Sequence, residues 1–393
     1  MLFAPISAQQ GLILVDGTGG TPEAFRSITA AVNSSAPGDT IYIRGLEMSG
    51  VPFGYADIVH PAFWSTQDAE TFPIHLKPGM TLKPLDSTPV YVWSAATGGP
   101  PEALFVADPG SSGVPTHLVD LHLAGGIAGV KITGAAGSSH DVLLEDLRFS
   151  WHTIGLDVQA DDASFVELTL RDCRFVDHKR DPVGYDPVLR NPSVGIRLHA
   201  LETNGNPGQI HATVDNLKTA GSFLSAELAP SPFPVGPNDL SATFPATTRL
   251  IEVYAAGSTG EHPNPLDPEY TEPIAEVLLD LNGGVLDGKA GSSSGWDLGL
   301  YAALGNNAPG DYRSGFRINL AGTQIHGFRV AGIHGCTNTG ARGEITLSGQ
   351  AAVTGTGLQG APVADQLWSS GVLLFGLDGY LGFRAADSTF QDN

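Results

Sequence analysis

The residues best suited to chemistry occupy one position of a short motif that recurs along the chain. The motif is a glycine followed by an apolar, a variable and a second apolar residue, as in Gly129-Val130-Lys131-Ile132. Such alternation predicts a β-strand whose apolar side chains face one side while the variable side chain faces the other. A copy without the glycine occurs at Leu250-Ile251-Glu252-Val253. In chain order the variable residues are Lys131, Asp157, Arg197, Glu252, Tyr301, His334 and Leu373.

Hydrolysis of a glycosidic bond is one reaction that these side chains could support. If each motif is one coil of a solenoid, the variable residues stack about 4.8 Å apart on neighbouring strands. Asp157 and Glu252 would then lie two rungs apart, with Arg197 between them. That separation, about 9–10 Å, is at or just beyond the distance at which an inverting glycosidase holds a water between two carboxyl groups.

β-Elimination is the second reaction. A lyase needs a base beside an acidic α-proton and a cation that neutralises the uronate carboxylate. The stacked variable residues, called the ladder below, include arginine, lysine, tyrosine and histidine, which are candidates for these two roles. We predict as catalytic residues Asp157, Arg197, Glu252 and His334, and as substrate-binding residues Lys131 and Tyr301.

A purely structural role for the ladder is also open. Opposite charges on neighbouring rungs are ordinary cross-strand pairs, and each contributes a few tenths of a kcal/mol, roughly, to sheet stability. Simple ligand binding is a third alternative.

Two turns carry further candidates for sugar binding. Trp151-His152 and Asp177-His178 occupy equivalent places shortly after Phe149 and Phe175, and Tyr185 follows in a long insertion. A flat ring beside imidazole and carboxylate groups is typical of a sugar-binding wall. We therefore predict Trp151, His152, His178 and Tyr185 as substrate-binding residues; the alternative for the indole is that it covers its own coil.

Four insertions border the motif strand and would build walls along one face. Insertions of a solenoid that gather on one face often mark its binding face, although β-turns are also where extra length is tolerated. The insertions are 179–193, 226–247, 257–273 and 357–369.

Composition and repetition together indicate how these residues are positioned. The 393 residues include 50 Gly and 28 Pro, and only 16% are charged, which favours a turn-rich all-β protein. A second segment, Val142–Phe149, recurs as Leu168–Phe175. Repeats of strand, turn and strand with variable loop lengths predict a solenoid, which grows in one dimension and forms one domain at this length.

The N-terminal segment resembles a known family. Val15-Asp16 precedes a glycine-rich turn, Glu23–Asn33 has the apolar spacing of an amphipathic helix, and Pro37-Gly38-Asp39-Thr40-Ile41 follows. This pattern, with 71–82 after it, resembles bacterial right-handed parallel β-helix proteins of the pectate-lyase-like superfamily, whose equivalent segment has no known function. The glycine expected after the next strand is replaced by Lys83-Pro84.

The resemblance implies a single-stranded right-handed parallel β-helix with a short N-terminal α-helical cap. We expect residues 1–45 to form the cap, continuous with a β-helix over 46–393 in one structural domain. The implied function is a carbohydrate-active protein, a lyase or glycoside hydrolase, that acts on an extracellular polysaccharide. The alternative is a non-catalytic glycan-binding, adhesive or structural module. Either would be secreted or at the cell surface, with the leader absent from this chain.

Charge and hydropathy exclude some partners. The formal net charge is −21, whereas nucleic acids and anionic membranes select clustered Lys and Arg. No apolar run reaches the roughly 18 residues of a membrane span. The last residues, 388–393, read like the middle of a coil, so we expect a further domain or partner at that open end.

Cysteine and metal signals are weak. Cys173 and Cys336 lie several repeats apart, so two free buried thiols are expected rather than a disulfide. Asp280, Asn282 and Asp287 offer oxygen ligands in a glycine-rich stretch that fits no calcium-binding motif. A solvated turn is favoured there, and calcium is the one candidate cofactor.

Overall fold

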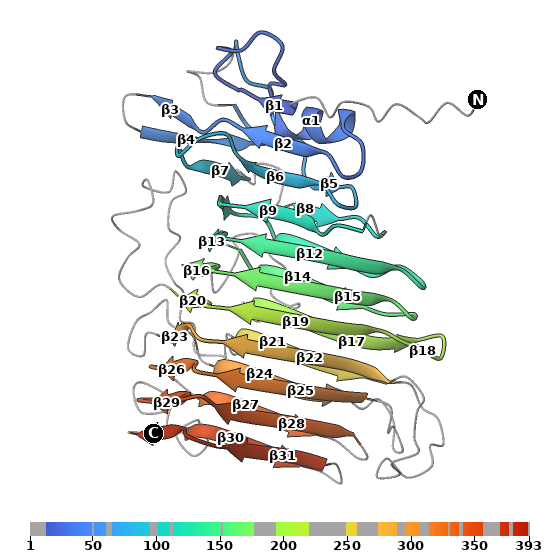
Figure 1. Cartoon of the computed structure of the whole chain (residues 1–393), viewed down its shortest axis with the longest axis vertical. Helices are drawn as coiled ribbons and strands as arrows, with labels where there is room; N and C mark the ends of the chain where they lie inside the picture. The colour runs from blue at the N-terminus through green and yellow to red at the C-terminus, as the bar shows by residue number, and fades with distance from the viewer. Residues whose placement is uncertain are drawn as a thin grey trace, which may run out of the picture.

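Three long parallel β-sheets run side by side along one axis of the molecule (Figure 1). In this computed structural model the described residues are 13–48, 51–59, 65–94, 101–110, 113–150, 152–176, 194–219, 249–257, 274–288, 296, 298–305, 314–328, 331–337, 341–356, 370–376 and 380–391.

After the N-terminal strands, successive coils contribute one strand to each sheet. The first sheet contains β1 (Ile13–Val15), β2 (Thr40–Ile43), β6 (Thr81–Pro84), β9 (Thr116–Val119), β12 (Ser139–Glu145), β15 (Phe165–Arg171), β19 (Gln209–Asp215), β22 (Ala275–Asn282), β25 (Ser314–Ala321), β28 (Arg342–Ser348) and β31 (Tyr380–Ala385). The second contains β3 (Leu46–Met48), β4 (Val51–Ala56), β7 (Val90–Trp93), β10 (Leu121–Ala124), β13 (Arg148–Ser150), β16 (Arg174–Val176), β20 (Lys218–Thr219), β23 (Val285–Asp287), β26 (Gln324–His326), β29 (Ala352–Thr354) and β32 (Thr389–Gln391). The third contains β5 (Ile74–Leu76), β8 (Ala103–Ala107), β11 (Ala128–Thr133), β14 (Ile154–Ala160), β17 (Val194–Thr203), β21 (Arg249–Ala256), β24 (Leu298–Gly305), β27 (Ala331–Thr337) and β30 (Ser370–Gly376), with β18 (Asn206–Pro207) beside β17.

Successive strands pass from the first sheet to the second and then to the third before the next coil begins. Strands of the same sheet pair in parallel, and among the described strands only β3–β4 and β17–β18 are antiparallel. Along each strand, alternate side chains enter one apolar core that includes Val15 at one end and Val353 near the other. The predicted all-β solenoid is therefore confirmed.

A left-handed residue makes the corner between the first and second sheets. Asp146 has φ 54° and separates β12 from β13, so the recurring segment Val142–Phe149 consists of two strands in different sheets. The Asp146 amide donates to the Arg171 carbonyl of the next coil, at 2.9 Å. Asp, Asn and Gly tolerate this conformation best, and the equivalent corners are Asp120, Asp172, Asn216, Gly283 and Gly322.

The motif glycine leaves room for the aromatic core. A Cβ on Gly155 would lie 2.4 Å from the Phe175 ring and 2.7 Å from the Gly195 carbonyl oxygen. Phe175 in turn stacks on Phe149 with ring centroids 4.7 Å apart. Glycine at this position is thus a packing requirement of the coil.

The copy that lacks the glycine is compensated within its own coil. Thr219 pairs with Phe175 in the second sheet and takes the place of the large ring. Leu250, in the glycine position of the following strand, is fully buried. The Leu250 side chain lies against Gly195, as the Phe175 ring lies against Gly155.

The N-terminal helix is shorter than predicted. α1 spans Ile28–Ser34, and the Ser27 side chain accepts a hydrogen bond from the Ala30 amide at its N-terminus. Phe25 lies outside the helix because its backbone pairs with β1, with the Asp16 amide donating to the Phe25 carbonyl at 2.8 Å. The prediction of a helix beginning at Glu23 was therefore wrong, since serine capping and strand pairing decide its first turn.

Both cysteines are free, as predicted, but only Cys173 is buried; Cys336 is half-buried. Within the described ranges, no helix is long and apolar enough to cross a membrane.

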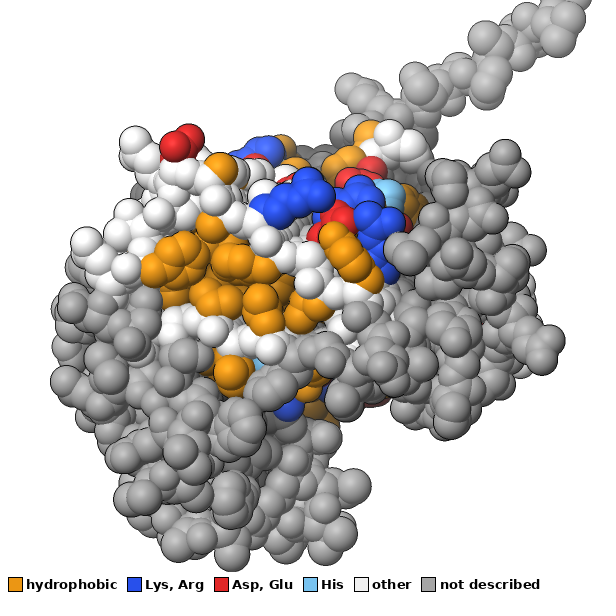
Figure 2. Space-filling model, turned by 90° about the horizontal axis from the view of Figure 1, so that it is seen from below, with side chains coloured by type: hydrophobic (Ala, Val, Ile, Leu, Met, Phe, Trp, Pro, Cys, Tyr) orange, Lys and Arg blue, Asp and Glu red, His pale blue; other side chains and the backbone are white. Residues whose placement is uncertain are grey.

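The last coil exposes apolar side chains. Leu374, Tyr380 and Phe390 are 36–45% exposed, and Leu381 and Phe383 pack against the core with part of their surface open. Seen from below, apolar side chains gather on this end of the solenoid (Figure 2).

Candidate functional site

The outer face of the third sheet carries the predicted ladder. The Cα partners are Lys131–Asp157, Asp157–Arg197, Arg197–Glu252, Glu252–Tyr301, Tyr301–His334 and His334–Leu373, all in register. The prediction that the variable residues stack on neighbouring strands is therefore confirmed. Seven successive strands present these side chains in one column.

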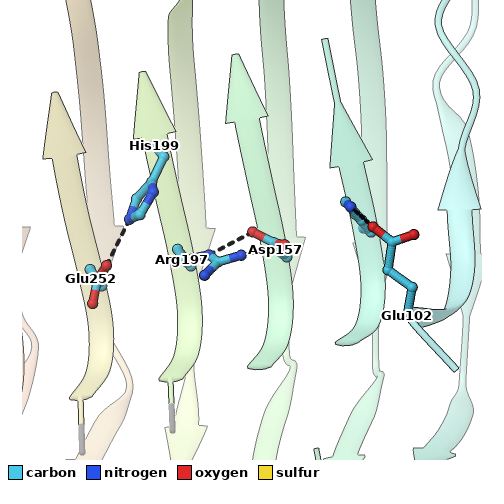
Figure 3. A network of polar contacts seen from close by, with 6 residues as sticks. Glu102, Asp157, Arg197, His199 and Glu252 are labelled. Carbon is cyan, nitrogen blue, oxygen red and sulfur yellow. Dashed lines mark hydrogen bonds and ion pairs between the residues drawn. The ribbon is translucent and has the colours of Figure 1, made fainter. Parts of the chain in front are cut away.

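Charged groups in this column bind one another. Arg197 donates from Nε and Nη2 to both oxygens of Asp157, at 2.8 and 2.7 Å. Lys131 pairs with Glu102 at the beginning of the column (Figure 3). The Asp157 side chain is only 9% exposed although it lies outside the core. A bidentate pair in such surroundings fixes both groups in position.

Glu252 is held by an imidazole and a guanidinium. Its Oε1 accepts from His199 Nε2 at 2.7 Å, and its Oε2 accepts from Arg249 Nη1 at 2.6 Å. Burial favours the protonated form, but the hydrogen bond from His199 and the charge of Arg249 outweigh it and lower the pKa of Glu252 to about 2. Glu252 therefore stays ionised at neutral pH.

His199 belongs to a second outward column, two residues further along each strand. Its rung partners are Gln159 and Tyr254, and the His199 and Tyr254 rings lie 5.2 Å apart. Sequence reasoning missed this column, although the alternation Ile196, Leu198, Ala200 marks both Arg197 and His199 as outward. The side chain of His199 is 23% exposed, so its ring reaches the surface.

Arg249 was also missed. Its guanidinium lies 3.8 Å from the centre of the Tyr301 ring while it binds Glu252. The Cα partners of Arg249 are the apolar residues Val194 and Leu298, so the repeat pattern alone places an apolar residue at this position. The arginine joins the Glu252 pair to the aromatic part of the column.

Tyr301 and His334 form the aromatic part. Their rings meet edge to face at 5.2 Å, and the Tyr301 hydroxyl lies 3.8 Å from Cys336 Sγ. Burial raises the pKa of Tyr301 to about 12, and burial together with the charge of Arg249 lowers the pKa of His334. Both side chains are thus neutral at pH 7 and offer polar, flat surfaces.

His152 lies inside the solenoid, contrary to its predicted place on a sugar-binding wall. It is fully buried, its Nε2 lies 3.1 Å from the Leu123 carbonyl oxygen, and burial lowers its pKa to about 4. A ligand on the outer face cannot reach it. The other wall candidates, Trp151, His178 and Tyr185, lie outside the described residues. The four insertions also lie outside them, except for residue 257.

No cation site forms within the described part of the chain, where no group of three His, Cys, Asp or Glu side chains has metal-binding geometry. The calcium candidates have separate partners instead. Asp280 accepts from Asn319 at 2.6 Å, Asn282 donates to Asp215 at 3.0 Å, and Asp287 lies 3.7 Å from His326.

Comparison with known proteins gives no match: no family model, no curated protein and no solved structure is similar to this chain. The resemblance of the N-terminal segment therefore depends on its motifs alone.

Proposed function

We propose that the protein is a polysaccharide lyase that acts on an extracellular, uronate-containing polysaccharide along the outer face of the third sheet. The observation that carries the proposal is the pair of Glu252 and His199, flanked by Arg197 and Arg249. A carboxylate that holds one imidazole nitrogen fixes the tautomer and orientation of the ring.

The chemistry assigns a role to each group. With Nε2–H donated to Glu252, the Nδ1 of His199 carries the lone pair that accepts the proton α to the substrate carboxylate. The electron pair of that C–H bond then forms the new double bond. The glycosidic oxygen on the β-carbon leaves with the electron pair of its C–O bond and takes up the proton that His199 accepted. Arg197 and Arg249 supply the positive charge that stabilises the carboxylate as the α-carbon loses its proton.

Hydrolysis is supported less well. A glycosidase needs one carboxylic acid that is protonated at neutral pH and gives its proton to the leaving group. Asp157 is bound by both donors of Arg197, and Glu252 has a strongly lowered pKa. Neither group suits the acid role.

A non-catalytic glycan-binding module is the second candidate. Its support is the mutual neutralisation of the ladder: Glu102 with Lys131, Asp157 with Arg197, and Glu252 with Arg249. A neutral face with Tyr301 and His334 exposed in part suits sugar rings without requiring turnover.

Several structural expectations accompany this proposal. Roughly 98% of crossover connections between parallel strands of one sheet are right-handed, which favours a single-stranded right-handed β-helix. We further propose that α1 and residues 1–45 cap a single domain that continues over 46–393, that the protein works outside the cell, and that a partner or further domain covers the apolar end. The exposed Leu374, Tyr380 and Phe390 support the last point.

A turnover screen tests the function. The purified protein is incubated with acidic and neutral polysaccharides, with and without calcium, and unsaturated products and reducing ends are followed in parallel. His199→Gln should lower the rate of unsaturated-product formation by about 100-fold or more. The matched control is His75→Gln, because His75 pairs with Asp108 at 2.9 Å on the same sheet but is exposed.

The outcomes separate the candidates. Growth of absorbance that depends on His199 supports the lyase. Reducing ends without absorbance establish a hydrolase and overturn the proposal. Retention on a polysaccharide gel without any turnover supports the binding module.

A further inference from the structure

Two arginines flank the pair of Glu252 and His199, and they differ in how their donors are used. Arg197 donates from Nε and Nη2 to both oxygens of Asp157, so it has a carboxylate of its own (Figure 3). Arg249 donates from Nη1 to one oxygen of Glu252, at 2.6 Å. The other oxygen of Glu252 accepts from His199 Nε2. Arg249 is therefore bound to its carboxylate through one nitrogen, whereas Arg197 is bound through two.

The remaining donors of Arg249 are not satisfied by the described residues. Its Nε is buried and has no hydrogen-bond partner among them. Its Nη2 also has no hydrogen-bond acceptor in that part of the chain, but this nitrogen is not buried. A guanidinium has its N–H donors in one plane, and Nη2 carries two of them. An acceptor that arrives from solvent can therefore bind at Nη2 while Nη1 stays on Glu252.

Tyr301 holds this guanidinium from the neighbouring coil. The centre of its ring lies 3.8 Å from the guanidinium carbon of Arg249, a distance at which a cation and an aromatic ring attract each other. The ring itself is fixed, because His334 meets it edge to face at 5.2 Å and Cys336 Sγ lies 3.8 Å from its hydroxyl. The guanidinium thus has a defined orientation before any ligand binds, which lowers the entropy cost of binding one.

A carboxylate at Nη2 would lie close to the base of the proposed elimination. Glu252 binds Arg249 through one oxygen and His199 through the other, so both residues have the same anchor. In a uronate the α-proton is on the carbon next to the carboxylate. A carboxylate bound by Arg249 therefore brings that proton towards His199 Nδ1.

We propose that Arg249, held on the Tyr301 ring, binds the free carboxylate of the substrate uronate, and that Tyr301 is a positioning residue that acts through Arg249. The inference deepens the proposed function and rests on it for the reaction, although carboxylate binding can be measured without turnover. It also separates the two arginines: Arg249 contacts the substrate carboxylate, and Arg197 acts on it only through its charge. A methyl ester has no charge with which to form a charge-assisted hydrogen bond, so the subsite selects the free acid. Tyr301 then acts without contacting the sugar, which differs from the substrate contact predicted from the sequence.

Binding of matched acid and ester ligands tests the subsite. Oligosaccharides of galacturonic, glucuronic and mannuronic acid, and their methyl esters, are titrated by calorimetry into the His199→Gln protein, so that turnover does not consume them. In this parent protein, Arg249→Gln should weaken binding of the tightest acid ligand by roughly 10- to 100-fold and change binding of its ester by less than about threefold. Arg249→Lys keeps the charge but not the flat donor group, and should weaken binding of the acid ligand by about tenfold.

Variants of Tyr301 test its role. Tyr301→Phe keeps the ring and should bind the acid ligand within about threefold of the parent protein, whereas Tyr301→Leu should bind it about 5- to 10-fold more weakly. Because the ring acts through Arg249, the double variant R249Q/Y301L should bind no more weakly than R249Q. Tyr42→Leu is the matched control: it removes a ring that lies 4.8 Å from Lys83 Nζ on the first sheet, and it should leave the affinity within about twofold.

The outcomes separate this inference from the lyase proposal. No binding of any acid ligand, unchanged acid affinity in R249Q, or equal losses for acid and ester overturn the inference. Losses that multiply in R249Q/Y301L show that Tyr301 contacts the sugar itself, and they overturn its positioning role. If acid ligands bind through Arg249 but the wild type forms no unsaturated product, the carboxylate subsite stands and the lyase proposal fails. If product formation depends on His199 while R249Q binds the acid ligand as its parent does, the lyase stands and the subsite fails.

Discussion

Arg197 binds both carboxylate oxygens of Asp157 across two neighbouring coils, 40 residues apart in the chain. The pair lies on the outer side of the sheet, yet Asp157 is nearly buried. Two groups that sequence reasoning assigned to catalysis therefore serve first to position each other. Arg197 can act on a substrate only from the orientation that Asp157 imposes.

Removing one partner of this pair should destabilise the protein. Asp157→Asn removes the negative charge that the half-buried guanidinium of Arg197 binds, and we expect the free energy of unfolding to fall by about 1–3 kcal/mol. Urea denaturation measures the change. Glu344→Gln, which breaks the more exposed pairs with Arg317 and Arg342, should change it by less than about 1 kcal/mol. Equal effects at both sites would contradict the positioning role.

Acid should weaken the protein through Glu252. Its folded pKa of about 2 lies below the ordinary value of 4.5, so its stabilising contribution is present above pH 4.5 and is lost as pH falls towards 2. Glu252→Gln should flatten this part of the stability profile. Unfolding curves recorded between pH 2 and pH 6 give the comparison, and parallel profiles for wild type and variant would refute the prediction.

Buried histidines should add a second pH range in which acid lowers the stability of the folded protein. Burial lowers the pKa of His152 from 6.5 to about 4, and burial with the charges of Arg148 and Arg174 lowers the pKa of His122 to about 3. The unfolded chain then binds more protons than the folded one, so stability falls as pH decreases from 6.5 towards these values. His152→Gln keeps a donor near the Leu123 carbonyl and should reduce the slope. An unchanged slope between pH 4 and pH 6.5 would place the acid sensitivity elsewhere.

The glycine and phenylalanine of the core should be energetically coupled. Gly155→Ala places a methyl group against the Phe175 ring, and we expect a loss of about 1–3 kcal/mol. Phe175→Leu frees part of that space, so the double variant should lose less than the sum of the two single losses. A double-mutant cycle from urea denaturation measures the coupling. Strict additivity would mean that the clash with the Gly195 carbonyl alone decides the cost.

The sequence predicted the register of the ladder because a β-strand has a period of two residues. The glycine marked the start of each copy, and apolar neighbours fixed which side chain faces outward. The corner at Asp146 was not predicted, because a single left-handed residue between two short strands leaves the alternation almost intact. The late start of α1 was missed for a similar reason: Phe25 has helical spacing but pairs with a strand.

The candidate site was predicted only in part. Glu252 and Arg197 were identified, but their partners decide their chemistry. His199 lies one alternation step beyond the motif, and Arg249 stands at a position where neighbouring coils carry Val194 and Leu298. Which cation binds which carboxylate depends on side-chain reach between coils, and the linear pattern does not encode it.

The stacking of coils also determines how the molecule bears mechanical load. Apart from β3–β4 and β17–β18, the described strands bond to the strands of the coils before and after them, and these bonds lie along the solenoid axis. A force applied along the axis to the last coil therefore opens β30, β31 and β32 before it reaches β27 and β28. The molecule should yield to pulling in small successive steps at modest force, one coil at a time.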